Sequence, residues 1–123
     1  MADVVHFISD MLFASKVREA AKHVGLSIQG TREPAALAAA AREAKLVIID
    51  LRLPLALDAL DALAADPATR AVPSVGFIDH ERTDVMDAAR AKGCRQVMAK
   101  GQFATALPKL LAGVVEPLPP AAA

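Results

Sequence analysis

Four charged side chains stand where short apolar runs of the chain end: Asp10, Asp50, Asp79 and Lys100. Clustered carboxylates repel one another unless a cation neutralises them. Mg²⁺ suits that role, because it binds carboxylate, water and phosphate oxygens. A carboxylate can also act as a nucleophile and form an aspartyl phosphate, and a nearby lysine then pairs with the new charge. These residue types therefore indicate phosphoryl chemistry, provided that the fold brings them together.

The elements that must position these residues alternate between strands and helices. Apolar runs predict five strands, and helical spacing predicts a helix after each of them, the last over 105–115. Continuous apolar strands alternating with helices indicate a parallel sheet covered on both faces. Right-handed crossovers then favour an α/β fold with a doubly wound, five-stranded, flavodoxin-like sheet and five helices. Ligands of such sheets bind beyond the carboxyl ends of the strands, where the four charged residues fall. The predicted strands cover residues 4–8, 26–29, 46–50, 72–78 and 94–99.

The composition sets limits on the class of protein. The chain has 123 residues, 54% of them hydrophobic, which suits one domain. We expect that domain over residues 1–115 and a Pro- and Ala-rich tail or linker stub over 116–123. The formal net charge of +0 provides no basic excess for direct nucleic-acid binding. With no membrane span, no secretory signal and the single Cys94, the sequence predicts a cytoplasmic protein.

The chain resembles the receiver domain of response regulators, the phosphoacceptor module of two-component signalling, over roughly residues 3–115. Residues 46–54 (LVIIDLRLP) match the family's apolar strand, its phosphoacceptor Asp and the Pro four residues later. Residues 93–100 (GCRQVMAK) match its Gly, the seven-residue step and the Lys that ends strand five. Residues 72–77 match the usual entry to strand four. The resemblance implies a CheY-like fold and a role in a phosphorelay.

The resemblance also implies roles for particular residues and for partners. Asp50 would be the phosphoacceptor, and Lys100 would pair with the phosphate. Mg²⁺ would be held by Asp10, Asp50 and the backbone carbonyl of Arg52. The partner would be a histidine kinase or phosphotransfer protein. An output domain or partner protein would bind the face formed by the fourth helix, fifth strand and fifth helix. No catalytic residue and no enzyme activity of its own are expected.

Several positions depart from the family pattern. Ser9 replaces the first of two acids after strand one, so Mg²⁺ binding should be weak or absent. Ile78 stands where the family has Thr or Ser, and Ile cannot donate a hydrogen bond to a phosphoryl oxygen. Val97 replaces the aromatic switch residue, and Gly101 replaces the Pro after the lysine. The relay from hydroxyl to aromatic ring is therefore missing, which predicts an atypical receiver with altered switch positions.

Two interpretations stay open at the level of sequence. One is an atypical phosphoacceptor, and the other is a pseudo-receiver that acts as a protein-interaction module without phosphorylation. A flavin-binding protein is disfavoured, because the turn at 9–12 has no Gly and the chain has no Trp or Tyr. A shifted alignment would place Asp79 in the pocket as a substitute acid. His6 is expected to be a satisfied core histidine and Cys94 a small buried hydrophobe.

Overall fold

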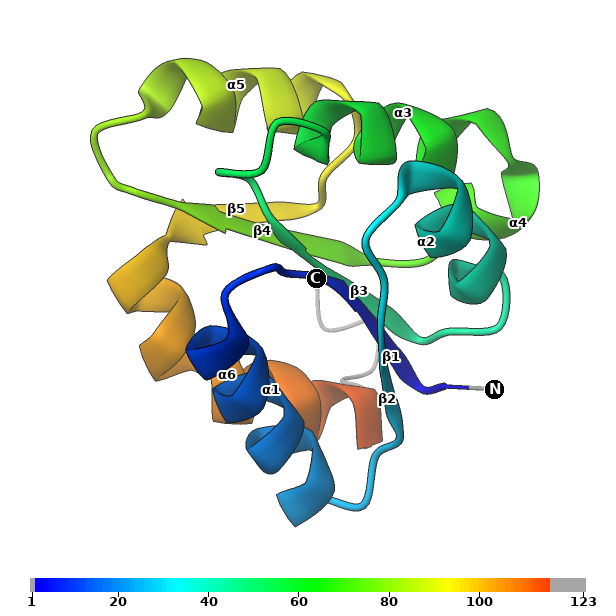
Figure 1. Ribbon diagram of the computed structural model, residues 1–123, viewed down its shortest axis with the longest axis vertical. Helices are drawn as coiled ribbons and strands as arrows, with labels where there is room; N and C mark the ends of the chain where they lie inside the picture. Colours follow the sequence, from blue (N-terminus) through cyan, green and yellow to red (C-terminus); the bar gives the residue numbers. More distant parts are fainter. Residues whose placement is uncertain (1, 116–123) are drawn as a thin grey trace, which may run out of the picture.

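A five-stranded parallel sheet forms the centre of the protein, in the order β2-β1-β3-β4-β5 (Figure 1). The computed structural model describes residues 2–115. The predicted tail over 116–123 lies outside these residues. The strand order is that of the doubly wound, flavodoxin-like sheet, so the predicted fold class is confirmed. The strands are β1 (Val4–Phe7), β2 (Ile28–Gly30), β3 (Leu46–Asp50), β4 (Ser74–Ile78) and β5 (Gln96–Ala99).

Helices cover both faces of the sheet, as Figure 1 shows. Apolar side chains of α1 and α6 pack with one face, and those of α2, α3 and α5 pack with the other. None of the helices within residues 2–115 has the length and apolar character needed to cross a membrane. The helices are α1 (Met11–His23), α2 (Pro34–Ala41), α3 (Ala56–Ala65), α4 (Pro67–Arg70), α5 (Thr83–Ala91) and α6 (Lys100–Val115).

The described residues contain one helix more than the five predicted, and its cause is local. Asp66 caps the short helix α4 by accepting a hydrogen bond from the backbone N–H of Ala68 at 2.9 Å. Pro67 occupies the first helical position, where its missing N–H does no harm. The predicted last helix begins five residues too late, because α6 starts at Lys100 rather than at Thr105. Strand β2 is also displaced, covering Ile28–Gly30 instead of 26–29.

Three aromatic rings form the core between the sheet and the helices α1 and α6. Phe77 lies 4.7 Å from Phe13 and 4.7 Å from Phe103, measured between ring centroids. Phe77 and Phe103 are fully buried, and Phe13 is nearly so. This cluster lies under the start of α6 and fixes the first turns of α1 and α6 against the sheet. The elements that carry Asp10 and Lys100 are therefore rigidly placed.

His6 is buried, but the prediction that it is a satisfied core histidine is wrong. Its exposed fraction is 4%, and neither ring nitrogen has a hydrogen-bond partner. The ring lies against Gly30 of the adjacent strand, where a Cβ would come within 2.8 Å of the His6 Cε1 atom. Gly30 therefore makes room for the imidazole, and the imidazole gains no polar contact in return. An unsatisfied polar group of this kind reduces the stability of the fold.

This unsatisfied ring makes stability depend on pH. Burial, and then the charge of Arg18, lowers the pKa of His6. The unfolded chain therefore binds a proton at higher pH than the folded chain does, so the free energy of unfolding should fall as pH drops below about 6.5. We expect His6→Leu to raise that free energy by about 1 kcal/mol at pH 7.5 and to reduce its loss on acidification. Urea denaturation of both proteins at pH 7.5 and 5.5 tests this, and equal pH dependence would contradict it.

Candidate functional site

The carboxyl edge of the sheet collects the predicted site residues from three strands. Asp50 is the last residue of β3, and Asp10 follows β1, the neighbouring strand. Lys100 follows β5 and is the first residue of α6. Two contacts connect these residues. Arg52 contacts both carboxylates, and Lys100 lines a cavity together with Asp10.

The carboxylate of Asp50 is almost completely enclosed and is bound by one arginine. Its exposed fraction is 1%. The Arg52 Nε atom donates to Oδ1 at 3.0 Å, and Nη2 donates to Oδ2 at 2.9 Å. The backbone N–H of Arg52 also donates to Oδ1, at 3.0 Å, which closes a tight turn after the strand. Both oxygens of Asp50 are therefore occupied by a bidentate, charge-assisted pair, and these hydrogen bonds raise the pKa of Arg52.

Asp10 serves first as the N-cap of α1. Its Oδ1 accepts hydrogen bonds from the backbone N–H groups of Leu12 at 3.0 Å and Phe13 at 3.1 Å. These bonds, that of Phe13 first, lower the pKa of Asp10. The charges of Lys100 and Arg52 act in the same direction. The Asp10 Oδ2 atom lies 3.9 Å from Arg52 Nη2, so the guanidinium lies between the two carboxylates.

Lys100 reaches the same edge but not the buried carboxylate. Its Nζ atom lies 5.1 Å from the centroid of the Phe13 ring, a cation–π distance. Among residues 2–115, Lys100 forms no hydrogen bond or ion pair with Asp50. In this arrangement, Arg52 rather than Lys100 neutralises Asp50.

The three residues predicted as altered switch positions lie in or next to strands of the sheet. Ile78 is the last residue of β4, is buried, and is paired with Ala99 of β5. Val97 lies within β5 and is half-buried, and Ser9 is exposed after β1. No cis peptide bond occurs within residues 2–115, which includes the bond to Gly101. Asp79 stands outside β4, and its charge acts on Arg52.

A divalent cation does not fit this donor set as it stands. Both oxygens of Asp50 accept hydrogen bonds from Arg52, and Oδ1 of Asp10 is used as a helix cap. Ser9, the position at which the resemblance to receiver domains implies a further acid, offers only a neutral hydroxyl. No group of three or more His, Cys, Asp or Glu side chains within the described part of the chain could hold a metal ion. The positive charge that contacts Asp50 comes from the protein itself, through Arg52.

The side chain of Arg52 is the feature that the sequence interpretation missed. Only its backbone carbonyl was assigned a role, as a metal ligand. An arginine two residues after a strand-end aspartate could have raised the question of an ion pair, because a tight turn brings these positions together. Cys94 agrees with its prediction as a buried hydrophobe, and burial raises the pKa of its thiol.

Comparison with known proteins gives the fold but no sequence family. No family model matches the chain, and no curated protein sequence matches it. Among solved structures, a response regulator from Hahella chejuensis superposes with a TM-score of 0.78 at 18% identity, covering 95% of this chain and 97% of the other. A chemotaxis response regulator of Vibrio cholerae gives a TM-score of 0.75 at 17% identity, covering 93% and 98%.

A third similar structure is the receiver domain of a sensor histidine kinase from Pseudomonas aeruginosa, with magnesium coordinated in its active-site cleft. Its TM-score is 0.75 at 14% identity, covering 93% of this chain and 97% of that one. The matches span nearly the full length of both chains. The protein therefore has the fold of a response-regulator receiver domain, CheY-like in architecture.

Proposed function

We propose that the protein is an atypical receiver module of two-component signalling that acts by binding a partner protein, with Arg52 in place of a divalent cation. The bidentate pair between Arg52 and the enclosed carboxylate of Asp50 is the observation that supports this most directly. A carboxylate that is 1% exposed and paired with a guanidinium is a poor nucleophile, because its charge is neutralised and a phosphodonor has little access to it. The module is expected in the cytoplasm and has no enzyme activity of its own.

The absence of the switch residues supports the same proposal. Ile78 offers no hydroxyl that a phosphoryl group could attract, and Val97 offers no ring that could change position. A phosphorylation signal would lack these two moving parts. The expected interaction surface is the face of α5, β5 and α6, where β5 is the edge strand of the sheet. Its partner would be a histidine kinase, a phosphotransfer protein or an output protein.

A second candidate function, aspartyl phosphoacceptor, is favoured by one specific observation. Asp10, Asp50 and Lys100 come from three strand ends and lie at one edge of the sheet. For this function, Arg52 would have to leave Asp50 before the phosphodonor arrives. Mg²⁺, which the Pseudomonas receiver domain coordinates, would then bind weakly through Asp10 and Asp50.

Mass spectrometry after incubation with acetyl phosphate and Mg²⁺ separates the two functions. We expect the wild-type chain to gain no phosphoryl group, whereas Arg52→Ala should gain one because the guanidinium no longer covers and neutralises Asp50. The double variant Asp50→Ala/Arg52→Ala controls for modification elsewhere and should gain nothing. A mass gain in the wild type that is lost in Asp50→Ala would instead establish the phosphoacceptor function and refute the proposed one.

A further inference from the structure

A cavity beside β1 and α1 is lined by polar and positively charged side chains. Its volume is about 290 Å³. It lies outside the Asp50 site, because neither Asp50 nor Arg52 lines it. None of the residues that line it is acidic, and Arg18 and Arg32 each bring a positive charge. The polar residues that line it are His6, Ser9, Ser15, Arg18, Thr31 and Arg32.

The buried imidazole of His6 lines this cavity. Both of its ring nitrogens lack a hydrogen-bond partner, although its exposed fraction is only 4%. Buried polar atoms are normally paired, so two orphaned nitrogens at a cavity wall call for an explanation. A bound ligand with hydrogen-bonding groups would supply one.

Two guanidinium groups at the cavity are also unpaired. Among residues 2–115, neither Arg18 nor Arg32 forms an ion pair or a side-chain hydrogen bond. Most other arginines of the described chain have such a partner, as Arg52 and Arg82 do. A planar guanidinium fork matches the oxygens of a carboxylate or phosphate group. The charge and the donor groups therefore favour an anion.

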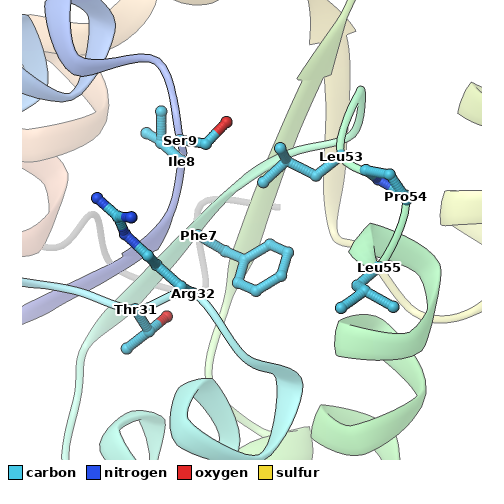
Figure 2. A pocket seen from close by; sticks show the side chains of 8 residues that line it. All are labelled: Phe7, Ile8, Ser9, Thr31, Arg32, Leu53, Pro54 and Leu55. Carbon is cyan, nitrogen blue, oxygen red and sulfur yellow. The ribbon is translucent and has the colours of Figure 1, made fainter.

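A second, apolar cavity adjoins the first one across the end of β1 and has a similar volume of about 290 Å³. The two cavities share four lining residues: Ile8, Ser9, Thr31 and Arg32. Figure 2 shows the Phe7 ring facing Leu53 and Leu55, while the guanidinium of Arg32 points away from them. The apolar cavity and the positively charged cavity thus meet at these four shared residues, which we call the rim.

The position of this rim in the fold also favours ligand binding. The apolar cavity lies beyond the carboxyl ends of β1 and β3, between the segment 7–9 and the segment 53–55. In the order β2-β1-β3-β4-β5, the chain goes from β1 to β2 toward one edge of the sheet and from β3 to β4 toward the other edge. Open α/β sheets leave a crevice at such a point, and small ligands bind there. Each cavity is close to the lower limit of about 300 Å³ for small-molecule sites.

We propose that this rim binds a small organic anion, with its phosphate or carboxylate group between Arg18 and Arg32 against His6 and its apolar group in the cavity lined by Phe7. The anion would satisfy the two guanidinium groups and an imidazole nitrogen together. The apolar group would cover Leu53 and Leu55. This site is independent of the function proposed for Asp50.

An NMR titration of the full ¹⁵N-labelled chain with three probes tests the proposal, in a buffer with chelator and without phosphate. The probes are phenyl phosphate, inorganic phosphate and phenol. We expect phenyl phosphate to shift the amide signals of Ser15, Gly30, Arg32 and Leu53 saturably. It should bind about tenfold more tightly than either probe that lacks one of its two parts. Saturable shifts confined to residues near Asp50, or no saturation with any probe, would overturn the proposal.

Charge-matched variants separate this site from general attraction of anions. Arg18→Gln/Arg32→Gln should weaken phenyl phosphate binding about tenfold or more, because both forks are lost. Arg95→Gln/Lys109→Gln removes the same charge at a different cavity and should leave binding unchanged. His6→Leu should weaken binding about fivefold, as expected for one hydrogen bond. Equal losses in the two double variants would show a long-range charge effect and overturn the site.

Discussion

Replacing Arg52 by alanine should destabilise the protein far more than replacing any other paired arginine. We expect the free energy of unfolding to fall by about 2 kcal/mol at pH 7.5, because the buried Asp50 carboxylate loses its charged partner. The Asp50 side chain is 1% exposed and the Arg52 side chain 33% exposed, so solvent screens the pair only in part. Urea denaturation monitored by circular dichroism measures the change.

The chain supplies a closely matched control for this experiment. Arg82 and Asp84 form the same kind of pair two residues apart, with Nε to Oδ1 at 3.2 Å and Nη2 to Oδ2 at 3.3 Å. That pair is exposed, its side chains being 55% and 71% accessible. Arg82→Ala should therefore lower the free energy of unfolding much less than Arg52→Ala does, because solvent screens an exposed pair. If both variants lost the same free energy of unfolding, burial would not strengthen the contribution of the Asp50 pair.

Replacing both Asp50 and Arg52 shows whether Arg52→Ala is unstable because a buried carboxylate is left unpaired or because packing is lost. Arg52→Leu/Asp50→Leu should recover much of the stability that Arg52→Ala loses, because no buried carboxylate is left without a partner. A double variant as unstable as Arg52→Ala would indicate that the turn after β3 depends on the aspartate itself. In that case the hydrogen bond from the backbone N–H of Arg52 to Asp50, at 3.0 Å, would be the main contribution.

The positions of the strand ends could be predicted because β3 and β4 are continuous apolar runs. Asp50 directly follows four buried residues, and the carboxyl ends of parallel strands meet at one edge. Asp10 and Lys100 could be placed at that edge for the same reason. Their contacts could not be predicted, because side-chain directions in a turn depend on tertiary neighbours. Lys100 belongs to a helix that starts at its own position, and it lies over Phe13 rather than toward Asp50.

The two features with the strongest functional implications depend on contacts that no local pattern reveals. The buried position of the His6 ring depends on Gly30, which is 24 residues away in the chain but adjacent in the sheet. The Arg52–Asp50 pair depends on one rotamer of a long side chain. A sequence pattern gives the chemical groups at a sheet edge, whereas their pairing decides which of them stay available to a ligand.

A divalent cation site should appear when the protein's own cation is removed and the missing acid is restored. We expect Ser9→Asp/Arg52→Ala to bind Mg²⁺, because Asp10, Asp50 and the new carboxylate then form an oxygen-rich set with an excess of negative charge. If the new site has a dissociation constant near about 0.1 mM, about 10 mM Mg²⁺ would raise the free energy of unfolding by about 2.7 kcal/mol. Mg²⁺ should raise the free energy of unfolding of the wild type only slightly, since Arg52 occupies both oxygens of Asp50.

The control is Ser9→Asn/Arg52→Ala, in which the residue at position 9 has the size of aspartate without its charge. If Mg²⁺ raised the free energy of unfolding of the wild type and the control as much as that of the double variant, Arg52 would not act in place of a metal. Asp50 would then be open to Mg²⁺ despite its burial.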